Sequence, residues 1–276
     1  MRPTTLKEAL KDKLTAEQKQ LLRTSYDLVG DIAIIEIPEE LSTKEKLIAK
    51  TLLELHKNIK VVCKKAGKHS GIYRTQKLKI LAGEKRFTTT HKENNCTFKL
   101  NVKTCYFSPR LATERLRIAN LVSPGESVLV MFAGVGPYPI VIAKNSKARS
   151  VTGIELNQEA YEFGFENVEL NKLTNTHMIW GDVRKVVPKL HKKFDRIVMP
   201  LPKGAEDFLD IALMASKKGS TIHFYDFLHE NLTHLAEDKI ARACKKAKKR
   251  FKILRIVRCG QQSPRVYRFC IDFMVL

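Results

Sequence analysis

Short apolar segments recur about every 25 residues in the second half of the chain, and predicted helices separate them. The five predicted strands are 127–132, 150–155, 176–180, 194–199 and 220–225. This alternation predicts a parallel, doubly wound sheet, because each helix carries the chain back across a face of the sheet. After a predicted helix at about 230–248, two final strands at 251–259 and 265–276 are separated by only five residues. Such a short connection makes them antiparallel to each other.

The first half of the chain lacks this rhythm. Residues 1–24 show an interrupted helical stripe of leucines, and 27–38 resembles one strand that ends at Pro38. Ser42 and Glu45 have the spacing of a capping box, which predicts the start of an amphipathic helix. Short strands are predicted at 60–65, 77–83, 86–94 and 96–102. We therefore expect a small α+β domain at 1–105 and an α/β domain with a mostly parallel sheet at 106–276.

The composition favours a chain that folds around its own core in a reducing compartment. The chain has 276 residues, of which 43% are hydrophobic, enough to bury a sizeable core. Its six cysteines form no C-x-x-C pair and no cluster with histidine at metal-ligand spacing, so we expect free thiols and no metal site. An apolar signal segment and a membrane-length apolar stretch are both absent from the sequence. These features predict a soluble, cytoplasmic protein.

Positive charge is spread over the whole chain. Residues 1–110 carry 23 basic and 12 acidic residues, and 111–276 carry 27 and 17, which gives a net charge of +21. A polyanion that contacts both halves would explain the excess, because each neutralised phosphate releases a counterion and adds affinity. The alternative is solubility in a salty or hot cytoplasm. A membrane surface is disfavoured, since no segment pairs basic residues with an exposed apolar stripe.

A glycine-rich turn follows the first strand of the predicted parallel sheet. Gly134 and Gly136 allow a tight bend and a close approach to a ligand, and the next helix begins there with free N–H groups. Glu155 ends the second strand, nineteen residues after Gly136, where it could accept ribose hydroxyls. Asp182 ends the third strand, where it could meet an adenine amino group. The turn lacks the third glycine of G-x-G-x-x-G, so the pattern favours S-adenosylmethionine over a dinucleotide. Taken singly, each acid could instead cap a helix.

Several stretches of the chain together resemble one family, the archaeal and eukaryotic type of tRNA (guanine37-N1)-methyltransferase. They are "GIYRTQKLKILAGE", "YFSPRLATERLRIANLV", "MFAGVGPYP", "GIELN", "GDVR", "MPLPKGAEDFLDIAL" and "SPRVYRFCIDF". The resemblance runs from about residue 27 to the end of the chain. It implies a Rossmann-like class I methyltransferase sheet, S-adenosylmethionine as the cofactor and tRNA as the partner. It also implies methylation of guanosine 37, beside the anticodon.

The resemblance also implies roles for individual residues. Cofactor contacts are implied at Phe132, Gly134, Val135, Gly136, Glu155, Leu156, Asp182, Val183 and Pro200. Arg74 would face the target base, and Glu114 would act as the base that removes its proton. Tyr106, Arg110, Arg115 and Pro202 would contribute to substrate binding.

The chemistry of guanine N1 suits these two catalytic residue types. N1 carries a proton at neutral pH, so a carboxylate such as that of Glu114 must accept it before N1 becomes a good nucleophile. Negative charge then grows on the guanine O6, where a fixed guanidinium such as that of Arg74 stabilises the transition state. The alternative for Glu114 is an ion pair with Arg110 or Arg117 on its own helix. For Arg74 the alternative is a surface charge in a turn.

The loop after the fourth strand departs from the family pattern. Related methyltransferases have N-P-P-Y or N-L-P there, whereas this chain has Pro200, Leu201 and Pro202. Pro200 lacks an amide hydrogen, so positioning of the base should rely more on backbone carbonyl groups or on Arg74. Trp180 is expected in the core beside the cofactor.

Two further features complete the sequence-based prediction. His223 and Tyr225 are assigned to the core. Few residues precede position 27, where many relatives carry a domain that reads the outer corner of tRNA, so recognition should centre on the anticodon stem. We predict a monomeric tRNA guanine-N1 methyltransferase. The alternatives are an aminocarboxypropyl transferase of the wybutosine pathway and a non-catalytic RNA-binding protein.

Overall fold

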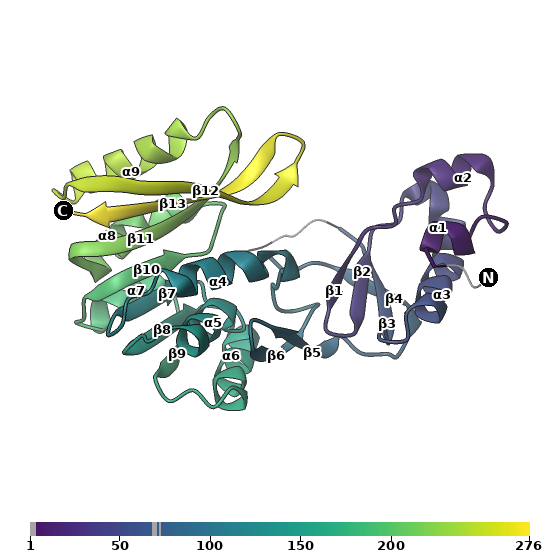
Figure 1. Ribbon diagram of the computed structural model, residues 1–276, viewed down its shortest axis with the longest axis horizontal. Helices are drawn as coiled ribbons and strands as arrows, with labels where there is room; N and C mark the ends of the chain where they lie inside the picture. Colours follow the sequence, from purple (N-terminus) through teal and green to yellow (C-terminus); the bar gives the residue numbers. More distant parts are fainter. Residues whose placement is uncertain (1–3, 68–70, 72) are drawn as a thin grey trace. The chain divides into compact units, whose positions relative to one another are not determined.

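The computed structural model describes residues 4–67, 71 and 73–276. The chain divides into two compact units, residues 1–92 with 98–109 and residues 93–97 with 110–276 (Figure 1). The strand pair β5 (Thr88–Glu93) and β6 (Cys96–Asn101) contributes residues to both units. Among the described residues, no helix has the length and apolar character needed to cross a membrane.

The first unit is built on a four-stranded sheet with the order β1-β2-β3-β4. The strands are β1 (Tyr26–Val29), β2 (Ile32–Ile35), β3 (Val61–Lys65) and β4 (Leu78–Gly83). The helices are α1 (Leu6–Ala9), α2 (Ala16–Leu21), the 3-10 helix η1 (Glu39–Lys44) and α3 (Glu45–Leu55). Strands β2 and β3 are parallel because α3 lies between them in the chain, and the other neighbours are antiparallel. Leucines of α1 and α3, such as Leu6 and Leu52, pack into the core beside this sheet.

Two expectations for this unit were wrong. The segment 27–38 forms two strands joined at Gly30, whose φ of 56° suits glycine and where an added Cβ would lie 2.2 Å from Thr89 Oγ1. The capping box of Ser42 and Glu45 does not form, because α3 begins at Glu45 and Ser42 lies within η1. The leucine stripe of residues 1–24 contains two short helices, α1 and α2.

The second unit contains a seven-stranded sheet with the order β12-β13-β11-β10-β7-β8-β9. Its strands are β7 (Ser127–Met131), β8 (Ser150–Glu155), β9 (Thr176–Trp180), β10 (Phe194–Met199), β11 (Ser216–His229), β12 (Phe251–Ser263) and β13 (Val266–Val275). The strands from β11 to β9 are parallel, and β13 runs antiparallel to both β11 and β12. The predicted α/β fold with a mostly parallel sheet and an antiparallel end is confirmed.

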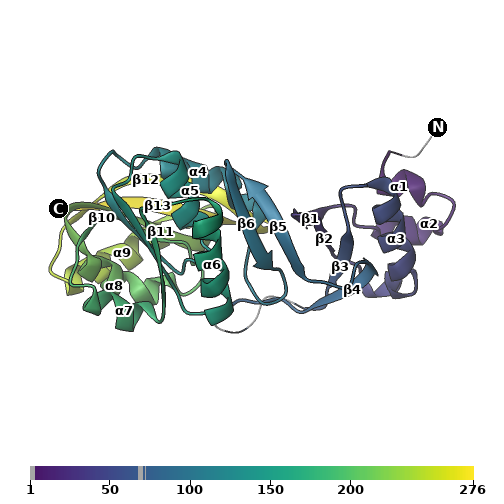
Figure 2. The same ribbon diagram turned by 90° about the horizontal axis from the view of Figure 1, so that it is seen from below.

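Helices cover both faces of this sheet (Figure 2). They are η2 (Pro109–Leu111), α4 (Ala112–Asn120), α5 (Pro137–Asn145), α6 (Gln158–Leu170), α7 (Val183–Lys189), η3 (Ala205–Phe208), α8 (Leu209–Ala215) and α9 (His234–Lys246). Ile222 and Phe224 of β11 point into an apolar core with α7, α8 and α9. Because side chains alternate along a strand, His223 and Tyr225 point to the opposite face, where α4 and α5 pack. Both are buried, so this second face has a polar interior.

Candidate cofactor and base site

The turn between β7 and α5 has the backbone geometry of a ligand cradle. Phe132, Gly134 and Gly136 have φ angles of 60°, 57° and 85°, which bend the chain sharply. Gly136 precedes the first residue of α5, and Pro137 occupies the first helical turn, where its missing N–H costs nothing. An added Cβ on Gly136 would lie 2.9 Å from the side chain of Ile140. Pro139 also lacks an N–H, and the Ile140 N–H donates to the Gly136 carbonyl at 3.0 Å, so of the first helical turn only the Tyr138 N–H is left for a polar ligand.

Glu155 at the end of β8 is tied to this turn. Its Oε2 accepts a hydrogen bond of 2.6 Å from the Gly134 N–H, and its Oε1 accepts one of 2.8 Å from the Asn157 N–H. Burial raises the pKa of Glu155, although hydrogen bonds from the backbone amides of Asn157, Gly134 and Leu156 act against that shift. A carboxylate has about four acceptor sites. Glu155 can therefore hold the turn and still accept a hydrogen bond from a ribose hydroxyl.

Asp182 and Trp180 lie at the end of the neighbouring strand, β9. The Asp182 side chain caps α7 by accepting a hydrogen bond of 2.8 Å from the Arg184 N–H. This is the helix-capping alternative, and it leaves the second carboxylate oxygen for a ligand. The expectation that Trp180 lies in the core was wrong, because 54% of the residue is exposed. Its indole N–H donates to the Leu156 carbonyl oxygen at 3.1 Å, which holds the ring across the strand ends.

The loop after β10 is held to its surroundings by its own backbone. The Leu201 N–H donates to the Met199 carbonyl at 2.8 Å, and the Pro202 carbonyl accepts from the Phe227 N–H of β11 at 3.2 Å. Pro200 lies between these contacts and has no N–H to offer. Beyond the loop, Phe208 contacts the Phe132 ring edge to face, with ring centroids 4.9 Å apart. The loop is therefore connected to the glycine-rich turn.

Glu114 lies on α4 with only 4% of its surface exposed. The Arg117 guanidinium donates to both of its oxygens, from Nε to Oε2 at 2.7 Å and from Nη2 to Oε1 at 2.8 Å. The ion-pair alternative raised for Glu114 is thus present in the structure. The Tyr225 hydroxyl also donates to Oε1, at 2.6 Å, and in turn accepts from the Tyr138 hydroxyl at 3.2 Å. Tyr138 belongs to the first turn of α5, so Glu114 is linked to the helix that follows the cofactor turn.

Arg115, which the resemblance assigns to substrate binding, is buried and does not lie on a surface that RNA could contact. It is 1% exposed, and its guanidinium donates to both oxygens of Glu93, from Nε at 2.5 Å and from Nη2 at 2.6 Å. The same guanidinium lies 6.0 Å from the centroid of the Tyr138 ring. Arg115 lies two residues after the exposed Thr113, on the opposite side of α4, and its side chain therefore points inward. Arg110, in η2, is exposed.

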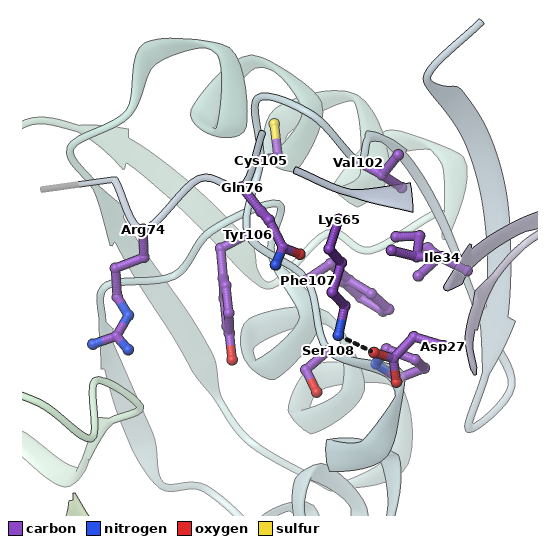
Figure 3. Close-up of a pocket in the computed structure, with 12 residues that line it drawn as sticks. Asp27, Ile34, Lys65, Arg74, Gln76, Val102, Cys105, Tyr106, Phe107 and Ser108 are labelled. Carbon is purple, nitrogen blue, oxygen red and sulfur yellow. Dashed lines mark ion pairs between the residues drawn. The ribbon is translucent and has the colours of Figure 1, made fainter. Parts of the chain in front are cut away.

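Arg74 and Tyr106 line one pocket of the first unit, together with Lys65 and Gln76 (Figure 3). Arg74 has a φ of 52°, a left-handed conformation that is uncommon outside glycine, and its N–H donates to the Gly71 carbonyl at 3.2 Å. Figure 3 shows the Arg74 and Tyr106 side chains extending in the same direction from the backbone. The pocket therefore combines a guanidinium with an aromatic ring, a pair that suits a nucleobase. Arg74 and Glu114 belong to different units.

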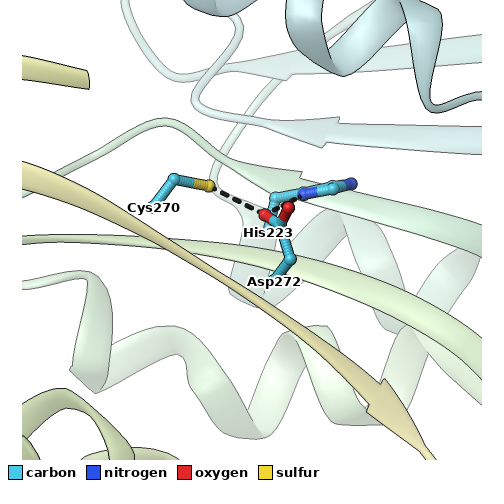
Figure 4. A group of neighbouring side chains, drawn as sticks. All are labelled: His223, Cys270 and Asp272. Carbon is cyan, nitrogen blue, oxygen red and sulfur yellow. Dashed lines mark hydrogen bonds and ion pairs between the residues drawn. The ribbon is translucent and has the colours of Figure 1, made fainter. Parts of the chain in front are cut away.

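His223, Cys270 and Asp272 form a buried cluster in the second unit (Figure 4). Arg196 Nη1 lies 2.8 Å from His223 Nε2, and a guanidinium can only donate, so Nε2 must accept. The proton therefore sits on Nδ1, which donates to Asp272 Oδ1 at 2.6 Å. Burial lowers the pKa of His223, in keeping with a neutral imidazole. A metal ion would have to displace Arg196 and lie beside Arg117, so the cluster fits a hydrogen-bond network better than a cation site.

The sequence analysis does not predict the side-chain network around Glu114. The spacing on α4 indicates Arg117 only as an ion-pair partner of Glu114, and Asp272 has no predicted role. A signal was present, since His223 and Tyr225 are polar residues two positions apart in an otherwise apolar strand. Cys270 and Asp272 repeat that spacing in the adjacent strand and pair with them directly in register. Buried polar side chains with matched spacing on paired strands predict a shared network.

Comparisons with known proteins identify the family. Residues 89–254 match the TRM5/TYW2 methyltransferase domain, and residues 6–86 match the TYW2 N-terminal domain. The similarity thus begins before residue 27, where the resemblance in the sequence was placed. The chain is 41% identical to the tRNA (guanine(37)-N(1))-methyltransferase Trm5b of Pyrococcus abyssi, over 99% of this chain and 81% of the relative. It is 39% identical to the tRNA (guanine(37)-N(1))/4-demethylwyosine(37)-methyltransferase Taw22 of Nanoarchaeum equitans, over 75% and 84%.

Solved structures agree with these matches. The complex of aTrm5 with tRNALeu superimposes with a TM-score of 0.87 at 33% identity, covering 100% of this chain and 79% of that one. The TYW2 of Methanocaldococcus jannaschii in complex with AdoMet gives a TM-score of 0.69 at 26% identity, covering 91% and 100%. The expected cofactor, S-adenosylmethionine, is confirmed. This chain belongs to the TRM5/TYW2 family of S-adenosylmethionine-dependent enzymes that modify tRNA at position 37.

Proposed function

We propose that the chain transfers a methyl group from S-adenosylmethionine to N1 of guanosine 37 in tRNA. The observation that carries the proposal is the buried Glu114 carboxylate. It is held by Arg117 and Tyr225, and the chain of hydroxyl groups leads from it to α5 behind the cofactor turn. Methylation at N1 needs a base for the N1 proton, and an oriented carboxylate provides one. The identity to Trm5b of Pyrococcus abyssi over nearly the whole chain supports this reaction.

The proposed roles of the other residues follow from their positions. The turn at Gly134 and Gly136, with Glu155 and Asp182, would bind the adenosine part of the cofactor. The cofactor supplies an electrophilic methyl group. Arg74 would stabilise the charge that develops on the guanine O6, and Tyr106 beside it would stack on the base.

The test is nucleoside mass spectrometry of a tRNA transcript with G37 after incubation with the protein and S-adenosylmethionine. We expect 1-methylguanosine with G37, none with A37, and at least about a tenfold lower rate for Glu114→Gln. Glu169→Gln, an exposed change on α6, is the matched control and should keep the wild-type rate. An aminocarboxypropyl adduct, or no product from protein that binds the cofactor, would contradict the proposal.

A second candidate substrate is 4-demethylwyosine at the same position. The relative Taw22 carries this activity in its name, and Pro200 removes the amide hydrogen that an asparagine would supply in the loop after β10. A tRNA that carries 4-demethylwyosine should be included as a parallel substrate. Methylation of that tRNA alone would replace the guanosine assignment, and methylation of both would extend it.

We also propose that the chain acts as a monomer, because the residues assigned to the cofactor and to the proton transfer belong to one chain. Light scattering coupled to gel filtration should give the mass of a single chain, 31.5 kDa. A mass of twice that value would contradict this proposal.

A further inference from the structure

The Arg117 guanidinium is shared between two carboxylates that are far apart in the sequence. It donates to Glu114 from Nε and Nη2, at 2.7 and 2.8 Å, and to Asp272 from Nη1 and Nη2, at 2.7 and 3.3 Å. Nη2 thus donates to both carboxylates. The three side chains are 17%, 4% and 5% exposed, so solvent screens these contacts little. Whatever strengthens one half of this arrangement weakens the other.

The oxygens of Glu114 are used unequally. Oε1 accepts from Arg117 and from the Tyr225 hydroxyl, whereas Oε2 accepts only from Arg117 Nε among the described residues. A carboxylate oxygen has two lone pairs. Oε2 therefore keeps one acceptor position, and it is the oxygen that can take a proton. The partners of Oε1 fix the plane in which that position lies.

Asp272 is held from its other side by groups that do not touch Glu114. His223 Nδ1 donates to Oδ1 at 2.6 Å, and the Cys270 thiol lies 3.2 Å from the same oxygen. Burial alone would raise the pKa of Asp272, but hydrogen bonds from His223 and Arg117 outweigh it and hold that pKa below its usual range. Asp272 is therefore a carboxylate at neutral pH. It keeps its hydrogen bonds from Arg117 Nη1 and Nη2 across that range.

We propose that Asp272 and Tyr225 are positioning residues that set the base strength of Glu114 in opposite directions, Asp272 through Arg117 and Tyr225 directly. Asp272 draws part of the Arg117 hydrogen bonding away from Glu114, which keeps Glu114 a better proton acceptor. Tyr225 stabilises the anion, which makes it a weaker but correctly oriented acceptor. This inference rests on the proposed function, because it concerns the same carboxylate.

Titratable and charged groups surround Glu114 on every element packed against it. They are Arg115 and Arg117 of α4, Tyr138 of α5, Arg196 of β10, His223 and Tyr225 of β11, Cys259 of β12, and Cys270 and Asp272 of β13. Burial raises the pKa of Tyr225 and of Cys270, so both remain protonated at neutral pH. Burial also lowers the pKa of His223. Neither substitution proposed below changes the charge of the other members of this set.

Two conservative substitutions separate the two effects. Tyr225→Phe keeps the ring and removes the donor to Oε1, and Asp272→Asn keeps the shape and removes the competing charge. Single-turnover rates of methyl transfer would be measured at saturating cofactor between pH 5 and 9. We expect Tyr225→Phe to be about three- to tenfold slower at pH 6 and to recover by pH 8. Asp272→Asn should be about three- to tenfold slower at pH 8, with the acid limb of its profile moved to lower pH.

The matched control is Tyr267→Phe on β13. Its ring packs against Arg258, and its hydroxyl makes no hydrogen bond with a described residue. This variant should keep the wild-type profile. The ionisation of the guanine is common to all variants, so only differences between profiles are interpreted. A uniform loss of rate at every pH in both variants would indicate a merely structural role and would overturn the proposal.

A measurement without tRNA separates this proposal from the proposed function. Protein labelled with ¹³C at the glutamate carboxyl carbon would be titrated by NMR, with the Glu114 signal assigned through Glu114→Gln. The titration midpoint of Glu114 should move to higher pH in Tyr225→Phe and to lower pH in Asp272→Asn. Midpoints that stay together would overturn the inference even if 1-methylguanosine is formed. Midpoints that separate would support it even if the product is a different nucleoside.

Discussion

The cofactor side and the base side of the second unit are built in different ways. The cofactor side uses the ends of β7, β8 and β9, where each group lies within a few residues of a strand end and bonds mainly to backbone amides. The base side uses side chains that bond to other side chains, and Glu114 and Tyr225 are 111 residues apart in sequence. A backbone-built site is therefore determined locally, while a side-chain network depends on the whole fold.

The two sides should also respond differently to substitution. A change on the cofactor side removes one ligand contact and leaves the backbone largely paired. A change on the base side leaves buried charges without partners, and that cost falls on the stability of the whole unit.

The largest effect is expected from Arg117→Met. This substitution leaves two buried carboxylates, Glu114 and Asp272, without their shared cation. We expect the free energy of unfolding to fall by about 3–5 kcal/mol, the typical cost of breaking a buried ion pair. Urea denaturation followed by circular dichroism would measure it. Arg255→Met, an exposed change on β12, should stay within about 0.5 kcal/mol of wild type. Equal stabilities of the two variants would show that the buried ion pairs of Arg117 contribute no more to stability than an exposed arginine does, and would contradict this prediction.

A smaller and more selective effect is expected from Glu155→Gln. In the wild type the two oxygens of Glu155 accept hydrogen bonds from the Gly134 N–H and the Asn157 N–H. In glutamine one of these oxygens is replaced by an NH₂ group, which would face an N–H group and could not accept its hydrogen bond. We expect about ten- to hundredfold weaker binding of S-adenosylmethionine by calorimetry, about 1.4–2.7 kcal/mol. The loss of stability should be smaller than in Arg117→Met, because only one backbone N–H loses its acceptor. Unchanged affinity would show that Glu155 shapes the turn without binding the cofactor.

The same contrast explains what the sequence could predict. The alternation of strands and helices, the turn at Gly134 and Gly136, and Glu155 at a strand end follow from short-range patterns, and the structure has each of them. The turn at Gly30 escaped prediction because one glycine in an apolar run resembles a continuous strand. Trp180 was misplaced because an aromatic residue that ends an edge strand has a neighbour on one side only.

The rest of the site depends on contacts between residues that are far apart in the sequence. Arg115 is next to Glu114 in a motif, yet it pairs with Glu93, which no spacing along α4 could reveal. Asp272 meets His223 only because β13 returns antiparallel to β11 in one register. A shift of that register by one residue would direct Asp272 to the apolar face. The network around Glu114 is thus a consequence of strand order, which the sequence pattern does not encode locally.

The smallest effect concerns the pH dependence of stability, and it tests whether the base side holds a neutral histidine. The pKa of His223 is lowered by burial from its ordinary value of 6.5. The unfolded chain therefore binds a proton that the folded chain does not bind as the pH falls below about 6.5. Stability contributed by the neutral ring is present above that pH and is lost as the pH falls, by at most about 1.4 kcal/mol per pH unit.

We expect His223→Gln to be less stable than wild type at pH 7.5 and to lose less stability between pH 7 and 5. The raised pKa of Glu155 contributes a slope of the opposite sign, but it does so in both proteins, so the difference between them isolates His223. His177→Gln, on the exposed side of β9, should keep the wild-type slope. Equal slopes in His223→Gln and wild type would mean that the imidazole is already charged against Asp272. Arg196 would then face a cation, and the proton positions assigned across the base side would have to be reversed.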